Sequence, residues 1–371
     1  SEKDIAVRTS LARRLRTMPI DTVINEAQLL FSEDSEGIIQ ILGELRSTKV
    51  ARFFIQISRS NEYSIPLRVA AIYAIVASEE WIREELSRSI DNDSIDEEIR
   101  VAAIHSIGGL APLQETFERL GSIKKYMETS LRGGVLWALQ FSTCLKILTD
   151  KDKEFCEQEL KYGLTDPVDW IRRRSAYIVG HLKLTALAPD LIALEEKEID
   201  RSEVRTAAYI GLKETASFTE FNSLLSLFRR EDKPEAVNHL SQTLVNTILR
   251  NPSKKFDVTP ILAKISFLLT SSDPLIREAG VRLAGFSNGG VTQLELLPFV
   301  KDPLPFVREA TLTALGRLDD MKATKTLFNS LNDGEPAIRE CAAWALLDLG
   351  GKQSLEYLLS FIASEGNDIT R

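Results

Sequence analysis

Apolar and small residues recur along the chain with the spacing of amphipathic helices. One short pattern repeats: Leu or a branched apolar residue, then Arg, then a run of small and apolar residues, as in Leu67–Ile75 and Ile338–Leu346. Apolar residues return every three or four positions in these runs, which places them on one face of a helix. The pattern therefore predicts a chain of short helices that each bury one face.

The arginine of this pattern marks the repeat, and we call the helix that carries it a marker helix. The marker positions are Arg68, Arg100, Arg132, Arg172, Arg205, Arg277, Arg308 and Arg339. They stand 32, 32, 40, 33, 72, 31 and 31 residues apart, and the gap of 72 spans two repeats, one with Asn238 in place of arginine. A period near 32 fits two short helices and two turns.

Each marker helix is followed by a second amphipathic stretch, which we call a second helix. Such stretches are Glu79–Ile90, Phe155–Leu164, Phe218–Phe228, Ala323–Leu331 and Ser354–Ile362. An aspartate followed by Pro or Gly stands before several marker helices, at Asp166, Asp273, Asp302 and Asp333. Aspartate caps the free amides at a helix start, and Pro is tolerated in the first turn. These signals predict where the marker helices begin.

Residues 1–60 lack the marker arginine, although Ile20–Phe31, Gly37–Leu45 and Val50–Ile57 are helical in pattern. We expect them to form an N-terminal helical cap with degenerate repeats, since solenoid ends must cover an exposed core. Residues 61–371 then form the repeat array. A change of curvature is expected at 229–257, which holds two prolines and the repeat without its arginine.

These repeated residues resemble the HEAT-repeat family, in the short bacterial variety first named from phycobilisome lyases, over roughly 64–364. The resemblance implies an all-α, right-handed α-solenoid (a superhelix) of helical hairpins. In that family the recurring arginine joins a ladder with aspartates and backbone carbonyls of adjacent repeats, so the eight marker arginines are interpreted as structural. The resemblance also implies a protein-interaction scaffold or adaptor that binds its partner on the concave face, which the second helices are expected to line.

Charge and cysteine content narrow the function classes. The net charge is −8, from 46 basic and 54 acidic residues. Because nucleic-acid binding depends on neutralising phosphates, an acidic chain argues against that partner. Three sparse cysteines do not resemble a disulfide framework, so we expect a cytoplasmic protein. Neither a membrane-spanning run nor a signal-peptide pattern is recognised.

A search for catalytic or metal-binding chemistry finds no strong pattern. The histidines, His105, His181 and His239, do not form the His-Glu pairs with which the HEAT enzyme deoxyhypusine hydroxylase binds iron, and each is interpreted as structural. Cys144 and Cys341 fall on apolar positions, whereas Cys156 is expected to be more exposed. We therefore expect no enzyme, no metal and no cofactor.

Two enzymatic alternatives stay open from the resemblance. One is a phycobilin lyase-like enzyme or chromophore carrier, because those lyases share the repeat type. The other, less favoured, is a DNA glycosylase, for which Arg172 to Arg174 with Trp170 is the nearest approach to a basic, aromatic groove.

Two irregularities are candidate partner-binding places. Residues 61–120 carry 5 basic and 12 acidic residues, which suggests an acidic patch for a basic segment of a partner protein. Ordinary solvated helix ends would account for the same charges. The second place is the repeat without its arginine, where packing that was relaxed to form a site would account for the polar residues. The alternative is that the repeat lost its usual residues at a curvature break without gaining a binding role. The candidate residues are Trp81, Glu80, Glu84, Glu85, Asn238, His239 and Gln242.

Overall fold

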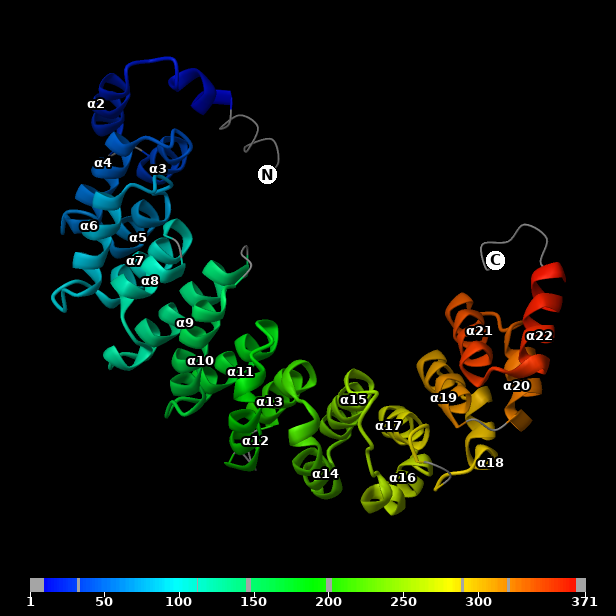
Figure 1. The fold of residues 1–371 in the computed structure, drawn as a ribbon. Coiled ribbons are helices and arrows are strands. Elements are labelled where there is room, and N and C mark those ends of the chain that lie inside the picture. The colour runs from blue at the N-terminus through cyan, green and yellow to red at the C-terminus, as the bar shows by residue number, and fades with distance from the viewer. Residues whose placement is uncertain are drawn as a thin grey trace. The chain divides into compact units, whose positions relative to one another are not determined.

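The computed structural model describes residues 10–31, 34–111, 113–144, 148–197, 202–287, 290–318 and 321–364. Every regular element in these ranges is a helix (Figure 1). The chain divides into two compact units, residues 1–178 (unit 1) and 179–371 (unit 2). The predicted all-α fold is confirmed.

The helices begin and end close to the predicted positions. Unit 1 contains α2 (Ile20–Leu30), α3 (Ser35–Gly43), α4 (Thr48–Arg59), α5 (Ile65–Tyr73), α6 (Glu80–Ile90), α7 (Glu97–Leu110), α8 (Leu113–Leu120), α9 (Thr129–Cys144), α10 (Asp150–Leu164) and most of α11 (Asp169–His181). Unit 2 contains α12 (Ala188–Lys197), α13 (Ser202–Thr215), α14 (Phe221–Arg230), α15 (Pro234–Arg250), α16 (Leu262–Leu269), α17 (Pro274–Ala284), α18 (Gln293–Leu296), α19 (Pro305–Arg317), α20 (Thr324–Ser330), α21 (Pro336–Leu349) and α22 (Gly351–Ser364).

The aspartates predicted to precede marker helices form one recurring turn. A side-chain oxygen of Asp166, Asp273, Asp302 or Asp333 accepts a hydrogen bond from the backbone amide two residues later, at 2.8 to 3.0 Å. This bond satisfies an amide that has no partner inside the helix. The same turn therefore sets the start of four marker helices.

The marker helices pack on one another, and the second helices cover one side of them. In unit 1, α5, α7 and α9 pack in succession, with α4 and α6 against α5 and α7. In unit 2, α13, α15, α17, α19 and α21 pack in succession, with α12, α14, α16 and α20 against them. Each unit is therefore a solenoid of helical hairpins, as predicted.

Small residues let neighbouring marker helices approach closely. A Cβ at Gly108 would lie 2.7 Å from Ala138 Cα, and one at Gly316 would lie 2.9 Å from Ala345 Cα. Such distances are shorter than van der Waals contact, so only glycine fits. These neighbouring marker helices are therefore packed at a short distance.

The second helices were expected to line the concave side, and this expectation is wrong. Figure 1 shows α13, α15, α17, α19 and α21 along the inner side of the curve of unit 2, with α12, α14 and α16 along its outer side. In unit 1, α4 and α6 likewise lie outside α3 and α5. The physical reason is the close packing of the marker helices over small residues, which bends each unit toward them. The sequence period requires two helices per repeat but does not state which one lies inside.

The predicted subdivision stays a prediction. Helices α3 and α4 of the proposed cap pack against α5 within unit 1, and the proposed curvature break at 229–257 contains α15, which packs against both α13 and α17.

Candidate interaction surface

Most of the marker arginines form hydrogen bonds and ion pairs with other residues of the chain. Guanidinium groups donate to carbonyl oxygens of the preceding turn, as in Arg172 to Asp166 (2.7 Å). Several also pair with a carboxylate before the next marker helix. These pairs are Arg68–Asp96, Arg100–Glu128, Arg132–Asp166, Arg277–Asp302 and Arg308–Asp333, at 2.6 to 3.4 Å. Arg339 donates to the carbonyl oxygens of Asp333 and Gly334. The contacts match the ladder that the family resemblance implied, and the structural role of the arginines stays our interpretation.

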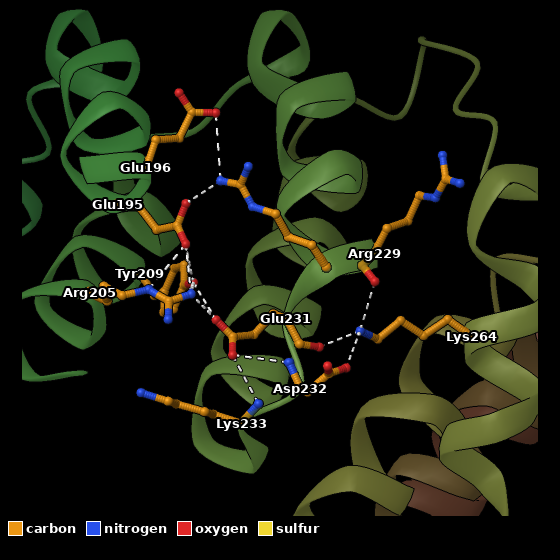
Figure 2. A network of polar contacts seen from close by, with 10 residues as sticks. Glu195, Glu196, Arg205, Tyr209, Arg229, Glu231, Asp232, Lys233 and Lys264 are labelled. Atoms are coloured by element: carbon orange, nitrogen blue, oxygen red, sulfur yellow. Dashed lines mark hydrogen bonds and ion pairs between the residues drawn. The ribbon is translucent and has the colours of Figure 1, made fainter. Parts of the chain in front are cut away.

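Arg205 departs from this ladder and lies in a buried network (Figure 2). Its guanidinium group contacts the carboxylates of both Glu195, at 2.8 Å, and Glu231. The hydroxyl of Tyr209 lies 2.8 Å from Glu195 Oε1 and 2.9 Å from Glu231 Oε2. Arg230 reaches the other oxygen of Glu195 at 2.8 Å. Two carboxylates, each with a side chain only 3% exposed, are thus held by arginines and a phenol.

Hydrogen bonds determine the charge state of this network. Burial acts to raise the pKa of Glu231, but the backbone amide of Lys233, Tyr209 and Arg205 together hold that pKa below its usual range. Burial and the neighbouring carboxylates raise the pKa of Tyr209, so the phenol stays protonated and donates. The network joins α12, α13 and the end of α14 with balanced charges, which fits a structural role.

In the repeat without its arginine, the polar residues of α15 form hydrogen bonds with neighbouring helices. Asn238, 7% exposed, donates to Glu278 at 3.2 Å, and Gln242 donates to Asn238 at 2.7 Å. Lys213 donates to Gln242 at 2.9 Å. His239 is half-buried in the same helix. The structure therefore places Asn238 in a polar chain across α13, α15 and α17, not on an open surface.

Two acidic residues of the segment pair with basic residues from outside it, Arg59 and Lys125. Glu85 pairs with Arg59 and Arg88 at 2.5 Å. Asp91 pairs with Lys125 at 2.6 Å. Glu80 lies 3.9 Å from Arg119, and Glu84 is exposed. The net charge of the segment thus overstates the field that a partner would meet.

Trp81 makes contacts within unit 1. Its indole nitrogen donates to Glu79 at 2.9 Å, and Arg52 lies over its ring at 5.2 Å from the centroid. It stands on α6, in the outer row of unit 1 (Figure 1). The proposed acidic patch around Trp81 stays a prediction, with fewer groups left to bind a partner.

A row of aromatic rings, exposed at its two ends, crosses the marker helices of unit 1. Ring centroids lie 6.0 Å apart for Tyr73 and His105, 4.4 Å for His105 and Trp137, and 4.9 Å for Trp137 and Phe141. Tyr73 is 51% exposed and Phe141 43%. A hydrogen bond of 2.8 Å joins the Tyr73 hydroxyl to His105 Nδ1. We call Tyr73, His105, Trp137 and Phe141 the aromatic strip.

The strip was not predicted from the sequence, although the sequence contains a signal for it. Tyr73, His105 and Trp137 each stand five residues after a marker arginine, as Tyr177 and Trp344 also do. A fixed offset from the marker places a residue at the same point of every marker helix. Aromatic residues at this position of neighbouring marker helices are therefore expected to form a row.

A groove adjoins the Tyr73 end of the strip, between α3 and α5. Its volume is about 720 Å³. Its lining includes Glu36 and Gln40 from α3, Glu44 directly after that helix, and Tyr73 and Val76 from the other side. Tyr73 belongs to both, so the strip and the groove meet at its ring.

Mild acid is expected to destabilise unit 1 through His105. Burial lowers the pKa of His105 in the folded protein below its ordinary value, which the unfolded chain keeps. At a pH between these two pKa values the unfolded chain therefore binds more protons than the folded protein. Stability is then complete above about pH 6.5 and is lost as the pH falls through that window. Thermal unfolding between pH 8 and 5 should show this loss, and a His105→Phe variant should show a shallower one. Equal slopes for both proteins would contradict the assignment.

The two described cysteine side chains, Cys156 and Cys341, have raised pKa values. Cys156, expected to be exposed, is fully buried, because it shares the apolar face of α10 with Leu160 and Leu164. Burial raises its pKa to about 12 and that of Cys341 to about 11, so neither thiol is activated. Cys144 lies outside the described side chains. 

The described ranges contain neither a group of three or more His, Cys, Asp or Glu that could hold a metal ion nor a helix long and apolar enough to cross a membrane. The bilin-lyase and glycosylase alternatives stay predictions.

Comparison with known proteins identifies the repeat and the fold. A family model described as HEAT repeats matches residues 293–371. No curated protein sequence matches the chain. Yeast importin-beta (Kap95p) is similar in structure with a TM-score of 0.59 at 14% identity, over 97% of this chain and 56% of that chain. An engineered protein is similar with a TM-score of 0.50 at 16% identity, over 91% and 92% of the two chains. Likeness at these identities concerns the fold alone. The chain thus carries HEAT repeats at residues 293–371 and folds as the α-solenoid that such repeats build.

Proposed function

We propose that this protein is a non-catalytic scaffold that binds an extended segment of another protein along the aromatic strip of unit 1. The observation that carries the proposal is the strip itself. Four rings, each in contact with the next, lie across α5, α7 and α9, and two of them are about half exposed. Aromatic side chains in contact and open to solvent are typical of binding surfaces, where they anchor a partner.

The dimensions of the strip fit a short extended segment. Neighbouring packed helices lie about 8–10 Å apart, so three of them span roughly 20 Å. An extended chain advances about 3.3 Å per residue, so about six or seven residues would cross the strip. The likeness to yeast importin-beta supports a scaffold role at the level of the fold.

A displayed library of random heptapeptides, selected on the immobilised protein, tests the proposal. Binders are measured against wild type and a Tyr73→Ala, Phe141→Ala double variant. Because hot-spot residues contribute about 2 kcal/mol or more, the variant should bind at least about 30-fold more weakly. Phe267→Ala is the matched control, since Phe267 is 71% exposed in unit 2. Equal loss in the control, or selection of no binder, would refute the proposed function.

A further inference from the structure

The groove beside Tyr73 has one wall of carboxylates. Glu36 and Gln40 of α3 and its C-cap residue Glu44 stand at one-turn spacing, and all three are exposed. Opposite them, the groove is lined by Tyr73, Ala70 and Val76. The space between a row of acidic side chains and an aromatic ring is suited to a side chain with an apolar stem and a positive end.

Glu36 and Glu44 differ from the acidic residues of α6 and the following loop. Glu85 and Asp91 have basic partners. Among the described residues, neither Glu36 nor Glu44 has a salt bridge, although Gln40 donates to Glu36 at 3.4 Å. Arg46 is the one basic residue among those that line the groove. Two carboxylates and one guanidinium group leave the lining with a net negative charge, and from outside the lining Arg16 donates to the backbone carbonyl oxygen of Glu44 at 2.5 Å.

We propose that this groove receives a lysine or arginine side chain, so that the segment bound along the strip is basic at the end that lies over α3 and α5. The inference rests on the proposed function and adds the chemistry of the partner. The cation would lie between the two carboxylates and against the Tyr73 ring. The same kind of contact occurs within the chain, where Lys124 lies 3.6 Å from the centroid of the Tyr162 ring. The remaining residues would pass over His105 and Trp137.

A protein segment fits this surface better than a nucleic acid does. Phosphates would approach Glu36 and Glu44 directly, and like charges in contact repel. The net charge of the chain, −8, opposes phosphates over longer distances as well.

Peptide charge and groove charge can be varied together. Heptapeptides selected on the wild-type protein should be enriched in Lys or Arg near one end. A fluorescent peptide from that set should bind at least about tenfold more weakly to a Glu36→Gln, Glu44→Gln double variant and lose most of its salt dependence. A Glu36→Lys, Glu44→Lys variant should prefer the same peptide with glutamate at the basic positions. Glu26→Gln with Glu154→Gln is the matched control, because both residues are exposed carboxylates of unit 1 outside the groove and outside residues 61–120.

The outcomes separate this inference from the proposed function. Selection of uncharged or acidic heptapeptides that still need Tyr73 and Phe141 would overturn the basic partner and leave the scaffold role intact. A basic peptide that binds the two groove variants and the control equally would do the same. Retention of a labelled single-stranded oligonucleotide on the strip, or a dimer in sedimentation that the strip variant abolishes, would overturn both.

Discussion

Replacing Arg205 by methionine is expected to lower the free energy of unfolding of unit 2 by about 3–5 kcal/mol, because it leaves two buried carboxylates without their shared cation. Glu195 would keep Arg230, while Glu231 would keep only uncharged donors, Tyr209 and two backbone amides. Methionine fills a similar volume, so the loss reports charge more than packing. Hydrogen exchange should show the loss in α12 to α14, which hold the network.

Two further variants make the prediction specific. Glu231→Gln, added to Arg205→Met, removes the unpaired charge and should recover much of the stability. Arg229→Met is the control, because its exposed side chain points away from the network in Figure 2, and surface changes of this kind stay within about 0.5 kcal/mol. A loss in Arg205→Met no larger than in the control would show that the network is not stabilising.

The second prediction concerns two adjacent glycines of α7 that should respond oppositely to the same change. A Cβ at Gly108 would lie 2.6 Å from Ala138 Cβ and 2.7 Å from Ala138 Cα, so α7 and α9 would have to separate. Gly108→Ala should therefore destabilise unit 1 by about 1–3 kcal/mol. A Cβ at Gly109 would meet only Phe141 Cε1, at 3.7 Å. Gly109→Ala should stabilise by about 0.5 kcal/mol, since alanine favours the helix.

Chemical denaturation of the two variants tests this prediction, and each serves as the control for the other. Both have the same change in helix propensity, so their difference isolates the contact with α9. Adding Ala138→Gly to Gly108→Ala should restore part of the stability by vacating the space. Shifts of the same sign and size in the two single variants would refute the close approach of α7 and α9.

Much of the fold could be predicted because its signals are local. The predicted Gly37–Leu45 is observed as Ser35–Gly43, and the predicted Glu79–Ile90 as Glu80–Ile90. One helix starts earlier than predicted because of a capping interaction at its N-terminus. Helix α10 begins at Asp150 instead of Phe155, because Thr149 and Asp152 form a reciprocal pair of hydrogen bonds at its start.

The candidate site could be predicted less well, because its residues meet across repeats. Counting charges along residues 61–120 suggested an acidic patch, but Arg59 and Lys125 come from outside that segment to neutralise Glu85 and Asp91. Asn238 was treated as a possible contact residue, yet its partner Glu278 is 40 residues away and buried with it. Such pairings depend on which helix lies beside which.

The sequence by itself determined the helices, their capping turns and the repeat near 32 residues, since each arises from interactions within a few turns of chain. The tertiary structure alone decided which row of helices lies inside the curve of each unit. It also decided which charges are neutralised, and it brought Tyr73, His105 and Trp137 together on one exposed surface. The physical reason is that a periodic sequence places the same position of every repeat in line, while the packing distance between helices decides whether those positions touch and what remains open to a partner.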